Sequence, residues 1–269
     1  MKPIFNQVAV IGAGAMGRGI AQIAAQAGSQ VWLYDTQAEA TLKAKDAVYQ
    51  MWDSLALKGR LDTETVSTYK SRLHIAASLQ DLKNCEMVVE AIIERLDIKK
   101  NLFIDLESIL SESAILVTNT SSLSVTAIAA ALKRPALFAG YHFFNPVPLM
   151  KVVEVIAGLK TNPEVCERLT HFAKQMGHTP VQANDTPGFI VNHAGRGYGT
   201  EALRIVSEGI ADFATIDRIL KDQVGFKLGP FELFDLTALD VSHPVMESIY
   251  NQYYQEPRYR PSTITAQRL

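Results

Sequence analysis

Two polar side chains lie in apolar runs of this chain, and their types could support acid–base chemistry. Glu154 falls within the run VVEVI at residues 152–156, which predicts a buried strand. A carboxylate buried without a partner costs several kcal/mol, so Glu154 needs one. His142 ends another apolar run, residues 137–141, and two prolines soon after it can turn the chain so that the two runs pair.

A carboxylate beside an imidazole favours one tautomer of the ring and makes the ring a better base. His142 and Glu154 are therefore predicted to form a general-base pair. The alternative is a histidine that only packs in the core, which is the more common use of such a residue. The choice between the two depends on what the remaining sequence predicts.

Composition and charge exclude several classes of protein. The chain has 269 residues, 48% of them hydrophobic, which is enough for one large or two moderate domains. Its net charge is −2 and its basic residues are scattered, so neither nucleic acid nor a membrane surface is expected as a partner. Cys85 and Cys166 lie far apart, and neither the cysteines nor the histidines have metal-ligand spacing. Because residues 1–15 also lack a signal-like apolar run, we predict a cytoplasmic protein without a metal site.

The N-terminal region is predicted to form a strand, a glycine turn and a helix. The β-branched run at residues 7–11 leads into GAGAMG, and a helical pattern follows. Gly12 suits the tight turn, Gly14 lets the backbone approach a pyrophosphate, and Gly17 lets helix and strand pack closely. The predicted cofactor-binding residues of this turn are Gly12, Ala13, Gly14, Ala15, Met16 and Gly17.

An acidic residue makes this motif more specific. The second predicted strand, residues 30–34, ends in Asp35, close to where the dinucleotide fingerprint expects an acid to bind a ribose 2′-hydroxyl. Asp35 would repel a 2′-phosphate, and Thr36 and Gln37 offer no arginine to receive one. The predicted cofactor is therefore NAD and not NADP.

Strands and helices alternate in the following sequence. Strands are predicted at residues 30–34, 73–76, 87–93 and 114–117, and helices at 37–59, 62–71, 79–83, 98–110 and 125–132. This alternation predicts an α/β fold with a Rossmann-like, doubly wound and mainly parallel sheet. The excursion over residues 37–71 is longer than a crossover requires and could form an arm over the cleft. Lys58 could meet a phosphorylated substrate there, or it could simply complement the helix dipole.

Ligands of such sheets bind at the carboxyl ends of strands, so the residues after each apolar run are informative. Glu90 and Glu94 follow one run, and TNTSS at residues 118–122 follows another. Helix capping explains Ser124 but not five small polar residues in a row. This loop is predicted to hold the nicotinamide ribose or a substrate oxygen.

The chain changes character at NDTPG, a polar turn cluster after which every predicted element is helical. We predict a first domain of residues 1–184 and a smaller all-α domain of residues 185–269. Asn192 should either be hydrogen-bonded in the core of the second domain or face the cleft. Glycines at 195, 197 and 199 resemble a nucleotide loop, but no strand precedes them, so they are predicted to permit close helix packing.

Taken together, the motifs resemble those of the L-3-hydroxyacyl-coenzyme A dehydrogenases over nearly the whole chain. They include Asp35 and, in chain order, GAGAMG from 12, VVEAIIE from 88, NTSSL from 119, HFFNP from 142, DTPGFIVN from 185 and GPFEL from 229. The resemblance implies NAD-dependent, reversible oxidation of an L-3-hydroxyacyl-CoA to the 3-ketoacyl-CoA, a step of fatty acid β-oxidation.

The resemblance also implies roles for single residues. His142 would be the base, Glu154 its partner, and Ser121 and Asn192 would hold the substrate. Lys58 would lie near the CoA phosphates. The residues implied near the nicotinamide half of NAD are Glu94, Lys99, Ser121 and Asn145. An acyl-CoA substrate and a homodimer formed through the helical domain are the implied partners.

Three features depart from the family pattern. Met51 stands where members tend to have a serine near the CoA, and the triple-glycine helix is less bulky than usual. The chain stops at Leu269, where relatives continue into a glycine-rich tail, so the helical domain is expected to be truncated.

Two alternatives remain open at this point. One is a dehydrogenase of a free hydroxy acid, which would need no CoA arm. The other is a non-catalytic NAD-binding or structural protein. Against the second, a buried His–Glu pair adds little stability, so its presence favours catalysis.

Overall fold

The computed structural model describes residues 2–269. The chain divides into two compact units, one ending at Asp185 and one comprising Thr186–Leu269. The first unit contains the sheet, and the second contains only helices.

The first unit is built on one eight-stranded sheet in the order β3-β2-β1-β4-β5-β6-β7-β8. Its strands are β1 (Gln7–Ile11), β2 (Gln30–Tyr34), β3 (Leu73–Ile75), β4 (Met87–Glu90), β5 (Ile115–Thr118), β6 (Phe138–Phe143), β7 (Val152–Ala157) and β8 (Thr179–Asn184). The first six are parallel, β7 runs antiparallel to β6, and β8 is parallel to β7. This order confirms the predicted doubly wound, mainly parallel sheet.

Helices cover both faces of this sheet. They are α1 (Ala15–Gln26), α2 (Ala38–Leu57), α3 (Thr63–Ser71), α4 (Leu96–Ile109), α5 (Val125–Ala129) and α6 (Pro163–Gln175), with short 3₁₀ turns at Leu79–Leu82 and Pro135–Leu137. The larger core lies under α1 and α6, where Phe5 meets Phe172 edge to face. On the opposite face Phe103 of α4 packs against Phe138 of β6. Because strand side chains alternate, a residue's position in its strand decides which of these two faces it joins.

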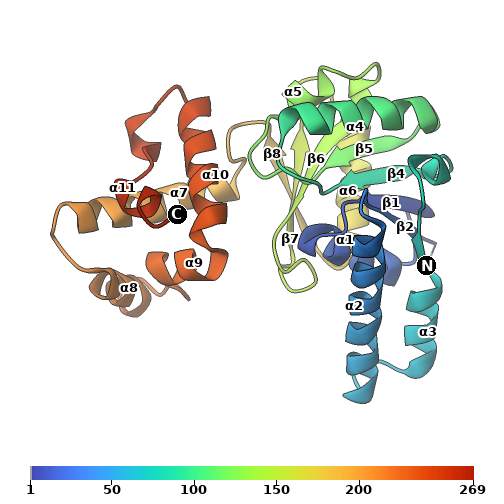
Figure 1. Ribbon diagram of the computed structural model, residues 1–269, viewed down its shortest axis with the longest axis horizontal. Helices are drawn as coiled ribbons and strands as arrows, with labels where there is room; N and C mark the ends of the chain where they lie inside the picture. Colours follow the sequence, from blue (N-terminus) through green and yellow to red (C-terminus); the bar gives the residue numbers. More distant parts are fainter. Residues whose placement is uncertain (1) are drawn as a thin grey trace. The chain divides into compact units, whose positions relative to one another are not determined.

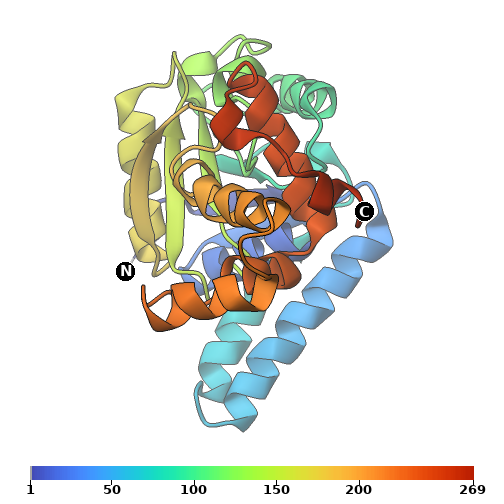
Figure 2. The ribbon, with the colours of Figure 1, turned by 90° about the vertical axis from the view of Figure 1, so that its left-hand side faces the viewer.

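Helices α2 and α3 form an arm that projects from the sheet, side by side in both views (Figures 1 and 2). Trp52 is fully buried between the rings of Tyr49 and Tyr69. Val66 of α3 is buried as well, whereas Leu57 near the tip of the arm is 90% accessible. The long excursion predicted from the sequence is therefore a helical hairpin whose buried side chains, Trp52 among them, join the core under α1.

One predicted strand is shorter than expected. The apolar run over residues 87–93 was assigned to a strand, but β4 ends at Glu90. The Glu90 carboxylate accepts a hydrogen bond from the backbone N–H of Ile92 at 2.7 Å, which turns the chain out of the sheet. Hydropathy alone missed this end because the residues that follow the turn are also apolar.

The helical unit consists of α7 (Val191–Ser207), α8 (Phe213–Asp222), α9 (Pro230–Thr237), α10 (Leu239–Gln252) and α11 (Thr263–Ala266), with a 3₁₀ turn at Pro257–Tyr259. Helix α7 runs through all three glycines, as predicted, and forms no nucleotide loop. A Cβ on Gly199 would lie 2.6 Å from the Phe234 ring of α9, so this glycine does permit close packing. That explanation is wrong for Gly195 and Gly197, which have open space around them.

Across residues 2–269, every helix is too short or too polar to cross a membrane.

The glycine turn before α1 offers a stability test. A Cβ on Gly17 would lie 1.8 Å from the Gly12 carbonyl oxygen, whereas a Cβ on Gly14 would meet nothing within 4 Å. Gly17→Ala should lower the melting temperature by several degrees, since each kcal/mol is worth about 2–4 °C in a domain of this size. Gly14→Ala is the matched control and should melt close to the wild type. Equal melting temperatures by circular dichroism would contradict the crowding seen at Gly17.

Candidate active site

His142 and Glu154 face each other on neighbouring strands. They are directly paired in the antiparallel register of β6 and β7, and His142 Nδ1 lies 2.6 Å from Glu154 Oε2. Both side chains are buried. Tyr141 and Phe143, on either side of the histidine, point into the core under α1 and α6, so His142 points to the face that α4 and α5 cover. The structure thus forms the pair that the two apolar runs predicted.

The pair determines which ring nitrogen is basic. An ionised carboxylate only accepts hydrogen bonds, so in the neutral imidazole Nδ1 holds the proton and donates it to Glu154. The lone pair is then on Nε2 of His142, and this is the nitrogen that can take a proton from a substrate. The ring of Phe144 lies 4.5 Å from the imidazole and limits its movement.

A second buried carboxylate lies on β4, three strands from Glu154. Glu90 ends β4 and is fully buried, with Lys99 of α4 donating to it at 2.5 Å and the Thr118 hydroxyl at 2.6 Å. Lys99 is itself 1% exposed and also reaches Glu94 at 3.2 Å. Lys99 was expected near the nicotinamide half of NAD. Because two carboxylates hold its ammonium group, we expect it to act there through Glu94.

Glu94 holds the polar loop after β5 in shape. Its carboxylate accepts hydrogen bonds from the Thr120 hydroxyl at 2.5 Å, the Ser121 N–H at 3.0 Å, and both the N–H and hydroxyl of Ser122. The sequence suggested the hydroxyls of this loop as ligand contacts. The hydroxyls of Thr120 and Ser122 instead donate to Glu94. The position of Ser121 depends on this cradle.

The charge of Glu94 depends on the same donors. Burial raises the pKa of Glu94, but the Lys99 ammonium and the hydrogen bonds from Thr120 and Ser121 lower it more, and the net pKa lies below the usual value. A lowered pKa in the folded state means that ionised Glu94 stabilises the fold above its unfolded pKa. This stabilisation disappears as the pH falls through the lowered value, so the loop is fully held at neutral pH.

Two contacts that the sequence did not single out position the loop. The Asn119 side-chain oxygen accepts a hydrogen bond from the Phe143 N–H at 2.9 Å, which ties the loop to the residue after His142. At the far end Asp185 accepts from the N–H groups of Val125 and Thr126, at 2.9 and 2.6 Å, and so anchors the start of α5. Ser124 caps that helix, as predicted. Both contacts join residues far apart in the chain, which local sequence patterns do not reveal.

The glycine turn has the shape that a dinucleotide needs. Gly12 has φ of +104°, and a Cβ there would lie 2.3 Å from the Ala91 carbonyl oxygen. Asp35 accepts hydrogen bonds from the N–H groups of Ala13 at 2.8 Å and Gln37 at 2.9 Å. A carboxylate has about four acceptor sites, so Asp35 can still bind ribose hydroxyls.

A pocket of about 680 Å³ adjoins this turn. Gly12, Gly14 and Asp35 line it together with apolar residues that include Ile93 and Leu102. Apolar walls beside an acid suit an adenine ring joined to a ribose. These residues fit the adenosine half of NAD.

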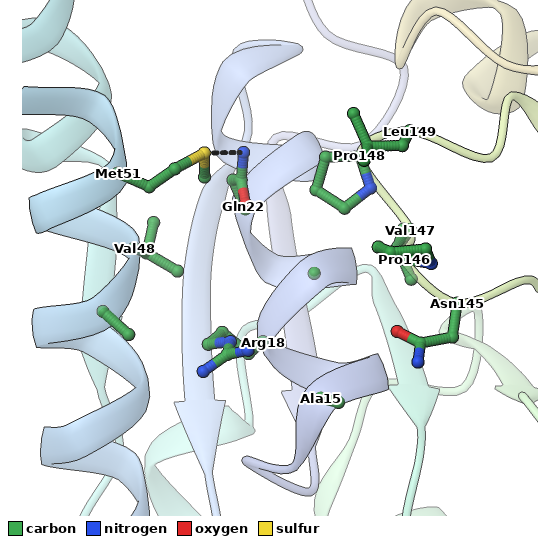
Figure 3. A pocket seen from close by; sticks show the side chains of 12 residues that line it. Ala15, Arg18, Gln22, Val48, Met51, Asn145, Pro146, Val147, Pro148 and Leu149 are labelled. Atoms are coloured by element: carbon green, nitrogen blue, oxygen red, sulfur yellow. Dashed lines mark hydrogen bonds between the residues drawn. The ribbon is translucent and has the colours of Figure 1, made fainter. Parts of the chain in front are cut away.

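A second pocket, of about 360 Å³, lies between α1, α2 and the loop of residues 145–149 (Figure 3). Its walls are mostly apolar. Met51 of α2 and Gln22 of α1 meet in its lining, with the Gln22 amide 3.5 Å from the Met51 sulfur. Arg18 is its one charged lining residue, and Asn145 stands on the opposite wall. Asn145, expected near the nicotinamide, is therefore exposed to a ligand-sized space.

Two other predicted residues lie away from these features. Lys58 is the exposed C-cap of α2, at the tip of the arm. Asn192 is half-buried in the first turn of α7, in the helical unit. Their contacts with substrate stay predictions.

Among residues 2–269 no cluster of His, Cys, Asp and Glu could hold a metal ion.

A glycine turn with an acid after the second strand is typical of a dinucleotide-binding sheet, and a buried His–Glu pair lies on another strand of the same sheet. Comparison with known families gives the particular family. Residues 7–186 match the model described as "3-hydroxyacyl-CoA dehydrogenase, NAD binding domain", and residues 188–269 match the C-terminal domain of the same family. The chain belongs to the 3-hydroxyacyl-CoA dehydrogenase family.

Individual relatives agree with this assignment. The chain is 45% identical to 3-hydroxyadipyl-CoA dehydrogenase of Escherichia coli over 96% of its own length and 54% of that protein. It is 42% identical to a probable 3-hydroxybutyryl-CoA dehydrogenase of Deinococcus radiodurans, over 95% of this chain and 91% of the relative. A crystal structure of 3-hydroxybutyryl-CoA dehydrogenase from E. coli superposes with a TM-score of 0.95 at 44% identity, covering 98% of this chain and 56% of that one.

The chain thus spans about half the length of two of these three relatives and nearly all of the other. The family assignment confirms the predicted fold class and NAD as the cofactor.

The buried cluster of Glu90, Glu94 and Lys99 can be tested by stability. Lys99→Met keeps the apolar stem but leaves Glu90 buried without its cation, which should cost about 3–5 kcal/mol of unfolding free energy. Lys43→Met is the matched control, because Lys43 is 80% exposed and pairs only with Glu39 on the surface. The control should cost less than about 1 kcal/mol. Urea unfolding measures both, and equal losses would contradict the structural role given to Lys99.

Proposed function

We propose that this protein catalyses the NAD-dependent, reversible oxidation of an L-3-hydroxyacyl-CoA to the 3-ketoacyl-CoA. The observation that supports this most is the buried 2.6 Å contact between His142 and Glu154 in a chain of this family. A pair of this kind, at the strand ends of a dinucleotide-binding sheet, is suited to removing a proton from an alcohol.

Each residue then has a role in the reaction. The glycine turn and Asp35 would hold NAD, which would supply the hydride acceptor. His142 Nε2 removes the hydroxyl proton, and Glu154 stabilises the imidazolium that forms. In the reverse direction the imidazolium returns this proton to the ketone oxygen. Ser121, positioned by Glu94, and Asn192 hold the substrate oxygens in this proposal.

The pocket between α1 and α2 is proposed for the thioester arm of the substrate. Its apolar walls suit an uncharged pantetheine chain, and Met51 replaces a polar contact there by an apolar one. Lys58 lies further along the same helix and would meet the CoA phosphates. A free hydroxy acid has no group that would occupy this pocket or contact the arm. A CoA thioester is therefore the favoured substrate class.

The relatives suggest two acyl classes. One is named for 3-hydroxyadipyl-CoA and others for 3-hydroxybutyryl-CoA. We propose that the acyl chain is of this short to medium length.

The proposed location is the cytoplasm. Cys85 and Cys166 are free and buried, and burial raises the pKa of the Cys85 thiol to about 12. Such thiols are inert and need no oxidising compartment.

The acid–base assignment predicts opposite pH responses in the two directions. Oxidation needs neutral His142, whereas ketone reduction needs the imidazolium, so the reduction rate should fall and the oxidation rate rise with pH. His142→Gln should lose about 10²–10⁴-fold in turnover and still bind NAD. Initial rates at saturating cofactor, measured in both directions across neutral pH, check this.

His171→Gln is the control for this experiment, because His171 is exposed on α6. It should keep the rates and pH profiles of the wild type. Near-native turnover of the His142 variant, or parallel pH responses in the two directions, would rule out His142 as the base.

We further propose a homodimer formed through the helical unit. The helical unit exposes several large apolar side chains, which an interface with a second copy could cover. They include Ile219, Val224, Phe226, Leu236 and Val241. A twofold dimer is the commonest closed assembly and would cover one copy of this surface with another.

Light scattering should therefore give twice the mass of the chain at micromolar concentration. Leu236→Glu, at a position that is 71% exposed, should shift the protein toward the monomer. Leu57→Glu is the control, because Leu57 is even more exposed but lies at the tip of the arm. A wild-type monomer, or an equal effect of both variants, would contradict this interface.

A further inference from the structure

Arg196, in the middle of α7, is a cation without a matching anion. Its Nε is shielded from solvent and has no hydrogen-bond partner among residues 2–269. The ion pairs found in the same residues do not include it either. Arg196 as a whole is half-buried, so the rest of its guanidinium can be reached by a ligand. A shielded donor without a partner is costly, and an anion that binds the guanidinium would reduce this cost.

Burial lowers the pKa of Arg196 to about 10, so the group still carries its charge at neutral pH. It offers a planar fork of N–H donors, which matches the two oxygens of a carboxylate. The neighbours on α7 do not compete for it. Gly195 and Gly197 flank it with open space, and the Thr200 hydroxyl is used by backbone carbonyls of Arg196 and Arg258.

The position of Arg196 on its helix indicates which ligand it meets. It lies four residues after Asn192, and residues four apart share one face of a helix, about 6 Å apart along the axis. In the proposed function Asn192 holds the acyl part of the substrate. The CoA phosphates are assigned to Lys58, on the arm. An anion that meets Arg196 would therefore belong to the acyl chain and not to the CoA.

We propose that Arg196 binds the distal carboxylate of a dicarboxylic 3-hydroxyacyl-CoA and so makes the enzyme selective for such chains. This rests on the proposed function, because it takes the reacting end of the acyl chain to be held by Asn192. A six-carbon dicarboxylic chain has its second carboxylate three bonds beyond the reacting carbon. A chain of the same length that ends in a methyl group would bury that methyl against the charged guanidinium and leave the charge unpaired.

The test compares three ketoacyl thioesters in the reductive direction: acetoacetyl-CoA, 3-oxohexanoyl-CoA and 3-oxoadipyl-CoA. The wild type should have a higher kcat/KM for 3-oxoadipyl-CoA than for 3-oxohexanoyl-CoA. Arg196→Met should lose roughly 10–100-fold in kcat/KM with 3-oxoadipyl-CoA, the range for a charged hydrogen bond. It should keep its rate with acetoacetyl-CoA and gain with 3-oxohexanoyl-CoA.

Two further variants complete the design. Arg196→Lys retains the charge without the planar fork, so it should keep a preference for 3-oxoadipyl-CoA, at a lower level than the wild type. Arg204→Met is the control, because Arg204 lies on the same helix, is about half exposed and pairs with Glu201. It should leave all three rates unchanged.

The outcomes separate this inference from the proposed function. Equal losses on all three thioesters in Arg196→Met, or a wild type without preference for 3-oxoadipyl-CoA, would overturn the carboxylate assignment alone. A wild type that turns over none of the three would overturn the proposed function and this assignment with it. Thermal unfolding of Arg196→Met and Arg196→Lys distinguishes a loss of binding from a loss of fold.

Discussion

The sheet unit depends on how it neutralises two carboxylates that are completely buried. Glu90 and Glu154 each end or interrupt an apolar strand, and both lie on the face under α4 and α5. Each receives a different cation. Lys99 reaches Glu90 from the helix that follows its strand, whereas His142 reaches Glu154 from the neighbouring strand. The first partner is a buried lysine that also holds Glu94, and the second is the imidazole that the proposed reaction uses. A buried carboxylate needs a hydrogen-bonding partner, so the fold requires both Lys99 and His142. The proposed base is thus held by the same requirement that holds the core.

The polar groups between these two pairs join them into one support. Thr118 is paired with Glu90 across the β4–β5 ladder, and its hydroxyl bonds to the same carboxylate. The loop after it is held by Glu94 on one side and, through Asn119, by the strand of His142 on the other. Loops at strand ends are normally the mobile parts of such a sheet. Here the loop is tied to Glu94, which follows β4, and to Phe143 of β6, and these contacts position Ser121.

The sequence predicted the sheet, the glycine turn and the His142–Glu154 pair, because each depends on local periodicity or on two runs joined by a short turn. It could not predict the partner of Glu90, since hydropathy does not say which way Lys99 points on α4. The early end of β4 was missed for a related reason: a side-chain hydrogen bond stops the strand, and no change in hydropathy marks it. The prediction that the glycines of α7 permit close packing was wrong for Gly195 and Gly197, because the sequence does not show whether a neighbouring helix lies beside a glycine.

The two edges of the sheet show how the first unit remains free of unwanted partners. An open edge strand exposes unpaired N–H and C=O groups that can recruit strands from other chains. At one edge β3 has three residues, too few to template a stable pairing. At the other edge β8 contains Pro180, which has no N–H to donate. Both edges are therefore poor sites for aggregation, even though the sheet between them is almost continuously apolar.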